Sequence, residues 1–100
     1  MPQLREILQN PKAFNLEHAL FADKSSLSLA SDCLVLNPDD VEDSDDVPDE
    51  ARAAGYDYVL MMDDVDSIIN NLTAQTSAPS DDLRFDAFSF YLARDAFIVV

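Results

Sequence analysis

A dense acidic segment interrupts the apolar pattern of this chain and limits how it can fold. Eight of the twelve side chains from 39 to 50 are acidic and none is basic. Apolar runs that predict β-strands flank it, at 33–36 (CLVL) and 56–62 (YDYVLMM). Because clustered carboxylates repel one another, the segment must lie on the surface, where salt or a cationic partner relieves the repulsion. It favours a binding function; the alternative is a solvated loop that only keeps the protein in solution.

Composition predicts one folded domain over residues 1–100. The 48% of hydrophobic residues supply a core, so the net charge of -14 does not indicate disorder. Twenty acidic side chains against six basic ones argue against direct binding of nucleic acid or an anionic membrane, and favour a basic partner. With no signal-peptide or membrane-spanning stretch, we expect a cytoplasmic protein.

Four segments predict helices and four predict strands. The expected helices are 2–10, 49–54, 63–75 and 81–94. The expected strands are 18–22, 32–36, 56–62 and 96–100, the first two forming a hairpin or meander. The unbroken apolar runs CLVL and YVLMM place their strands near the centre of the sheet. We therefore predict an α+β fold with about four mostly antiparallel strands and helices packed mainly on one face.

Local sequence signals add detail to the predictions for two of these helices. Pro48 and Gly55, the only glycine, bracket the helix at 49–54, so the neighbouring acidic residues are displayed in a fixed way. In the last helix, apolar side chains span an arc of about 220°, wider than a one-sided surface helix needs. That arc, which includes Phe85, Phe88 and Leu92, predicts burial on two sides or contact with another chain, such as a homodimer.

No residue pattern indicates catalysis, a metal or a cofactor. The segment 39–50 has the length of a calcium-binding loop, but Val41 and Ser44 occupy positions that need a ligand and a glycine. The single histidine, His18, and the single cysteine, Cys33, lie in predicted strands, where core packing is the usual role. We expect a protein that is not an enzyme.

Five segments carry a resemblance to a known class of proteins: LREILQNPKAF, HALF, CLVLNPDDVEDSDDVPDEARAAGYDYVL, DVDSIINNL and FDAFSFYLARDAFI. Together they cover nearly the whole chain and are similar to a family of small acidic bacterial proteins. These resemble the immunity proteins of polymorphic toxin systems, including contact-dependent growth inhibition. The resemblance implies that the chain binds and blocks a cognate toxin domain, of nuclease type, in the cell that produces the toxin.

The predicted partner-binding residues follow from the acidic segment and the strand after it. They are Asp39, Asp40, Glu42, Asp43, Asp45, Asp46, Asp49, Glu50 and Tyr56. Within them, we expect Asp45, Asp46, Asp49 and Glu50 to contribute most, because they lie nearest the helix that Pro48 and Gly55 delimit. Two other functions stay open: a nucleic-acid mimic that inhibits a DNA-binding protein, and a small regulatory or assembly subunit that uses the last helix.

Overall fold

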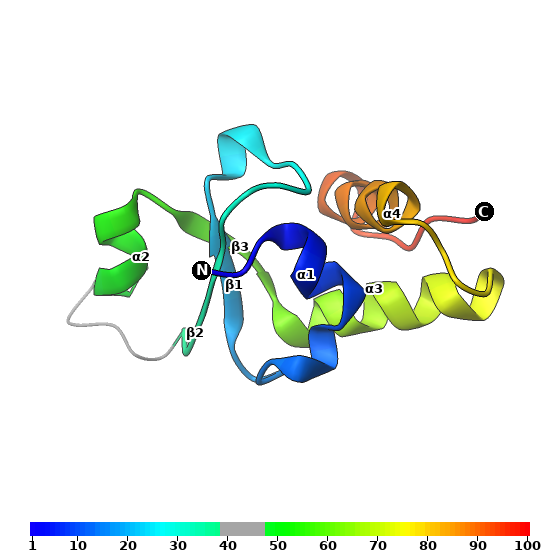
Figure 1. Cartoon of the computed structure of the whole chain (residues 1–100), viewed down its shortest axis with the longest axis horizontal. Coiled ribbons are helices and arrows are strands. Elements are labelled where there is room, and N and C mark those ends of the chain that lie inside the picture. The colour runs from blue at the N-terminus through cyan, green and yellow to red at the C-terminus, as the bar shows by residue number, and fades with distance from the viewer. Residues whose placement is uncertain (39–47) are drawn as a thin grey trace.

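The computed structural model describes residues 1–38 and 48–100 and shows an α+β fold (Figure 1). Its elements are α1 (Leu4–Gln9), η1 (Pro11–Ala13), β1 (Ala19–Ala22), η2 (Lys24–Ser26), β2 (Leu34–Leu36), α2 (Asp49–Ala54), β3 (Asp57–Met61), α3 (Met62–Gln75) and α4 (Asp81–Arg94). All four predicted helices are present, within two residues of the expected bounds. Figure 1 shows α2 on one side of the sheet and α1, α3 and α4 on the other, as the prediction of one dominant helical face requires.

The described strands form one antiparallel sheet in the order β2-β1-β3. Leu20 of β1 lies opposite Val35 of β2 and Leu60 of β3. The central strand is therefore β1, whose four residues are all buried, whereas the CLVL and YVLMM runs form the two edges. The prediction that those runs lie at the centre is wrong: all three residues of β2 are only partly buried, and Val59 is the one fully buried residue of β3. An unbroken apolar run therefore does not distinguish a partly covered edge strand from a central one.

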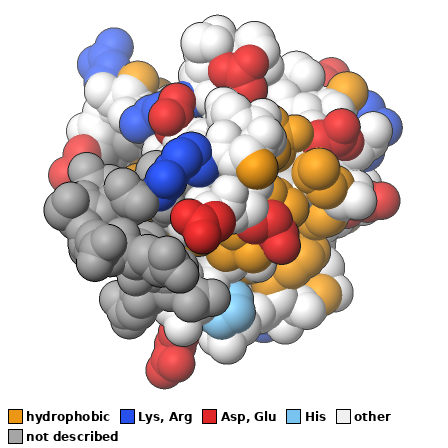
Figure 2. Space-filling view, turned by 90° about the vertical axis from the view of Figure 1, so that its left-hand side faces the viewer, with side chains coloured by type: hydrophobic (Ala, Val, Ile, Leu, Met, Phe, Trp, Pro, Cys, Tyr) orange, Lys and Arg blue, Asp and Glu red, His pale blue; other side chains and the backbone are white. Residues whose placement is uncertain are grey.

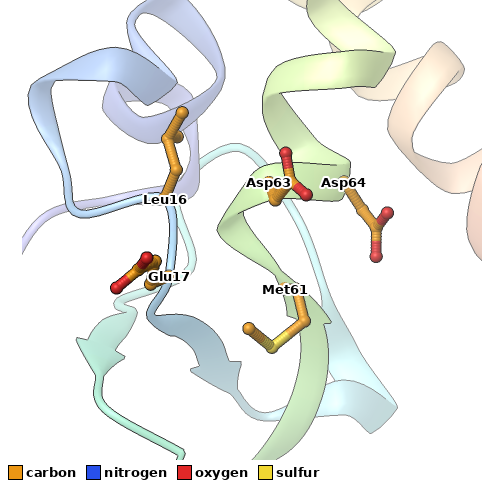
Figure 3. A pocket seen from close by; sticks show the side chains of 5 residues that line it. All are labelled: Leu16, Glu17, Met61, Asp63 and Asp64. Atoms are coloured by element: carbon orange, nitrogen blue, oxygen red, sulfur yellow. The ribbon is translucent and has the colours of Figure 1, made fainter.

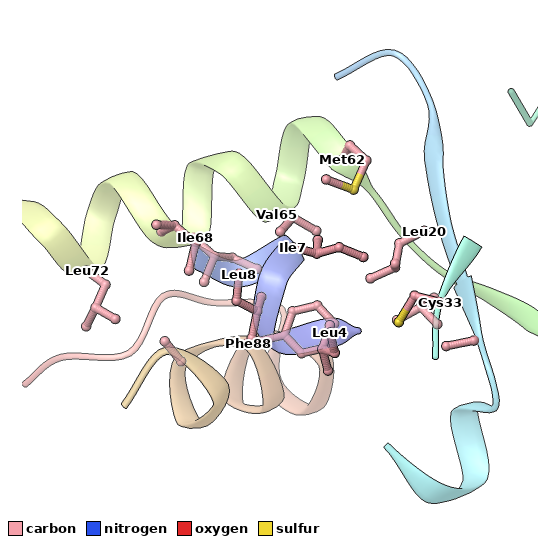
Figure 4. Packing of buried hydrophobic residues seen from close by; sticks show 14 residues of the cluster. Leu4, Ile7, Leu8, Leu20, Cys33, Met62, Val65, Ile68, Leu72 and Phe88 are labelled. Carbon is pink, nitrogen blue, oxygen red and sulfur yellow. The ribbon is translucent and has the colours of Figure 1, made fainter. Parts of the chain in front are cut away.

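Two apolar clusters, one on each face, hold the sheet to the helices. The larger joins Leu20 and Cys33 to apolar side chains of α1, α3 and α4, as Figure 4 shows. The smaller consists of Ala19, Phe21 and Ala51 of α2, with partly buried neighbours. Burying a large aliphatic or aromatic side chain contributes about 1.5–3 kcal/mol, so the larger cluster dominates the stability of the fold.

Helices α3 and α4 begin in different ways. Ser80 caps α4, since its hydroxyl accepts a hydrogen bond of 3.1 Å from the Leu83 backbone N–H. Helix α3 follows β3 with no intervening loop, and its N-cap is Met61, which has no side-chain capping bond. Asp63 and Asp64 lie within the first turn of α3, where they complement the positive end of the helix.

The C-terminal segment at 96–100 is not a strand, contrary to the prediction. It runs as irregular chain after α4, and the Gln75 side chain holds it. Gln75 donates from Nε2 to the Ile98 carbonyl at 2.8 Å and accepts at Oε1 from the Val100 N–H at 3.0 Å. Local β-propensity is a weak guide here: no described strand pairs with the segment, and the Gln75 amide bonds two of its backbone groups.

Within residues 1–38 and 48–100, no helix is long and apolar enough to cross a bilayer.

Candidate functional site

Helix α2 presents the described end of the acidic segment. Pro48 is buried and Ala51 packs into the smaller cluster, so the exposed Asp49 and Glu50 sit on an anchored first turn. Gly55 ends the helix with φ +76°, the left-handed conformation that glycine adopts without strain, as predicted. Asp49 lies 3.7 Å from Arg52, an exposed pair of the kind that contributes little to stability.

Three of the nine predicted partner-binding residues can be placed in the structure. Asp49 and Glu50 are exposed side by side, while Tyr56 is half-buried against the smaller cluster, with its hydroxyl 3.9 Å from the Met1 sulfur. The packing of Tyr56 is that of a core residue with a polar tip. The remaining six lie outside the described residues: Asp39, Asp40, Glu42, Asp43, Asp45 and Asp46.

A pocket that the sequence did not reveal lies where β3 passes into α3. It has a volume of about 490 Å³ and is lined by Leu16, Glu17, Met61, Asp63 and Asp64. Figure 3 shows Leu16 and Glu17 on the segment before β1, with the Met61 side chain directed from the end of β3 toward that segment. Asp64 lies at the outer rim, on the side of the helix away from Leu16. The volume falls within the range of about 300–1,000 Å³ typical of ligand pockets.

The sheet register explains why the pocket is acidic. Ala19 pairs with Met61, and the Met62 N–H donates to the His18 carbonyl at 2.9 Å, extending the antiparallel pairing beyond the strands. This pairing brings the segment before β1, which carries Glu17, to the start of α3, which carries Asp63 and Asp64, and all three acidic residues line the pocket. Their like charges repel one another, and a cationic ligand would relieve that repulsion.

Few of the described carboxylates have a cationic neighbour. Ion pairs between described residues use only Asp49 and Asp81, the latter with Arg5 at 3.7 Å and Arg84 at 2.8 Å. None of Glu17, Asp63 and Asp64 belongs to such a pair. No charged or polar residue in the described part of the chain is buried, so these charges all act at the surface.

The charge of Asp64 at the pocket rim affects the pKa of two tyrosines. The Asp64 carboxylate is the main cause that raises the pKa of Tyr91, with burial and Asp95 adding to it. Burial and then Asp64 raise the pKa of Tyr58, whose ring packs edge-on against Phe21 at 6.1 Å. Both phenols therefore stay neutral and can donate hydrogen bonds.

Figure 2 shows a continuous apolar area on one face of the molecule, with acidic side chains along its border.

The wide apolar arc of α4 is mostly covered within the monomer. Phe88 is fully buried, and Phe85 and Leu92 are partly buried against the larger cluster. Phe90 is half-exposed and belongs to neither cluster; the Arg94 guanidinium lies 5.8 Å from the centre of its ring. A homodimer through this helix remains a proposal, and its contact would centre on Phe90.

The described residues show no catalytic pairing around Cys33. Burial, and to a lesser extent Asp32, raise the pKa of its thiol to about 12, far from that of a reactive thiolate. Outside the segment 39–47, no group of three or more His, Cys, Asp or Glu is placed to hold a metal ion. The pocket carboxylates thus do not converge on one small cation.

Comparison with known proteins gives the family. The family described as a domain of unknown function, DUF7716, matches residues 1–100. The chain belongs to DUF7716. No curated protein and no solved structure matches it significantly. The family assignment thus covers the acidic segment, α2 and the pocket in a single domain, but it assigns none of them a role.

Proposed function

We propose that this protein is an immunity protein, acting in the cytoplasm, that binds a basic toxin domain and blocks it. The observation that supports this most is the charge distribution. The net charge is -14, and the described residues bury no charge and neutralise few carboxylates by ion pairs. Such a surface costs folding free energy through self-repulsion, which a basic partner would remove.

A nuclease domain fits this surface chemically. The groove of a nuclease that holds RNA or DNA is basic, so carboxylates can occupy the positions of phosphates. The exposed Asp49 and Glu50 on the anchored first turn of α2 would lose little freedom on binding, which favours affinity. Barnase and barstar, a nuclease and its acidic inhibitor, show that close charge pairs can contribute about 1.5–7 kcal/mol and steer association.

The decisive experiment is protection from a toxin. Each candidate toxin domain encoded near the gene for this chain is produced in a sensitive bacterium, with and without the chain, and survival is counted. Survival only with the chain, together with a stable complex of the two purified proteins, is the expected result. If no neighbouring toxin is neutralised and the chain proves to inhibit a DNA-binding protein instead, the nucleic-acid-mimic function replaces this proposal.

Salt dependence tests the electrostatic part separately. Steering between opposite charges is screened over about 8–10 Å near physiological ionic strength, so the association rate should fall steeply with added salt. The dissociation rate should change less. Stopped-flow association rates that stay constant from low to high salt would remove the acidic surface from the mechanism.

A further inference from the structure

We infer that the pocket between the segment before β1 and the β3–α3 junction receives an arginine side chain of the partner protein. The inference rests on the proposed function for the partner, but the pocket's preference for arginine can be measured without it. The occupant follows from the lining: apolar surface from Leu16 and Met61, and carboxylates from Glu17, Asp63 and Asp64.

The apolar part of the lining favours a cation with a long stem. Leu16 and Met61 are partly buried, and Figure 3 shows the Met61 side chain directed toward the segment that carries Leu16. Lysine and arginine lay their methylene stems along such surface while the charged group reaches polar atoms. A small inorganic cation gains nothing from this surface, and the described carboxylates form no metal-holding group.

The carboxylates favour arginine over lysine. Glu17 and Asp63 line the pocket from two different chain segments, and neither has an ion-pair partner among the described residues. A planar guanidinium carries five donors and can bond to more than one carboxylate at once. It is also more weakly hydrated than an ammonium group, so it loses less on leaving water.

The pocket is also open to a partner. Helix α3 starts at Met62 without using the side chain of Asp63 or Asp64 as a cap, so both carboxylates can bond to a ligand. Glu17 and Asp63 are exposed and Asp64 is partly exposed.

The test titrates the protein with blocked amino acids as probes. Binding is monitored by the NMR shifts of the Met61 methyl group and the backbone amides. N-acetyl-arginine amide should bind at the pocket at least tenfold more tightly than the uncharged citrulline analogue, with the lysine analogue between them. Equal shifts for arginine and citrulline, or arginine shifts spread over the α4 carboxylates, would overturn the inference.

Matched variants locate the binding. Glu17→Gln with Asp63→Asn should weaken arginine binding at least tenfold, whereas Asp82→Asn with Asp86→Asn, the same charge change on α4, should leave it within twofold. If the first variant does not fold, Glu17→Gln alone, at an exposed position outside every helix and strand, should still weaken binding measurably. An equal loss in both double variants would show only a general charge effect. Failure of toxin protection with intact arginine binding would reject the proposed function and not the pocket.

Discussion

The Asp64 carboxylate on α3 disfavours ionisation of the Tyr91 phenol on α4. Its negative charge is the largest of the effects that raise the pKa of that phenol. The same carboxylate is only the second cause for Tyr58 on β3, after burial. One side chain at the pocket rim is thus electrostatically coupled to a strand and to a second helix.

Replacing Asp64 with Asn should lower both tyrosine pKa values toward the ordinary value of 10.0, and Tyr91 should shift more. Tyrosine ring signals followed by NMR across alkaline pH would separate the two. Asp95→Asn is the matched control, since it should lower the pKa of Tyr91 slightly and leave Tyr58 unchanged. Equal shifts of both tyrosines in the Asp64 variant would contradict this assignment.

The same raised values predict an alkaline loss of stability. A phenol whose pKa is raised by folding ionises more easily in the unfolded chain, so unfolding releases protons above pH 10. The contribution is complete below that pH and is lost as pH rises through the folded-state values. Urea unfolding at increasing alkaline pH should therefore give falling midpoints, with a smaller fall in the Asp64→Asn variant.

Cys33 should be chemically inert in the folded protein. Its thiol is buried and has a pKa of about 12, so almost no thiolate exists near neutral pH. Ellman's reagent at pH 8 should react slowly with the native protein and completely after addition of denaturant. Rapid reaction of the native protein would mean that the environment of Cys33 opens readily.

Gln75 should determine how tightly the C-terminal segment is held. Gln75→Ala removes two hydrogen bonds to the backbone of Ile98 and Val100, each worth about 0.5–1.5 kcal/mol at most in an exposed setting. Faster hydrogen exchange at the Val100 amide is the expected readout. Asn70→Ala, which removes another exposed side-chain bond of α3, is the control and should leave that amide unaffected.

Neutralising acidic residues in two groups should reveal which part of the acidic segment binds the partner. Asp45, Asp46, Asp49 and Glu50, changed to Asn and Gln, should weaken binding far more than the same change at Asp39, Asp40, Glu42 and Asp43. The reason is that Asp49 and Glu50, the described members of the first group, lie on α2, which Pro48 and Ala51 anchor, so they lose less freedom on binding. Circular dichroism should show an intact fold in both. The reverse order of losses would reject this assignment.

Self-association through α4 should depend on Phe90 and on salt. Two chains of net charge -14 repel each other, so a dimer should strengthen as salt screens that repulsion. Phe90→Ser should abolish it without unfolding the protein, because Phe90 belongs to neither apolar cluster. A monomer at every salt concentration, measured by sedimentation, would exclude the dimer.

Local pattern was enough to predict the helices. Val65, Ile68, Ile69 and Leu72 recur at helical spacing, and all four are buried in α3. Likewise Gly55 marks a left-handed helix end that few other residues adopt easily. In both cases the signal lies within a few residues of the feature it predicts.

Tertiary pairing could not be predicted in the same way. The pocket depends on the segment with Glu17 lying near the start of α3, which follows from the pairing of Ala19 with Met61 and not from any local motif. The C-terminal run has the composition of a strand, but its backbone at Ile98 and Val100 bonds to the side chain of Gln75, more than twenty residues earlier in the chain. The central position of β1 likewise depends on strand order, which hydropathy alone does not predict.

The direct passage from β3 into α3 limits how related chains can vary. An inserted or deleted residue at Met61 or Met62 would turn α3 by about 100° relative to the sheet and carry Asp63 away from the pocket. No loop is present there to absorb the change. Point substitutions, by contrast, alter the charge and size of the lining while the scaffold stays fixed. Divergence of partner preference within the family should therefore proceed at this junction by exchange of side chains, with the length of the chain preserved.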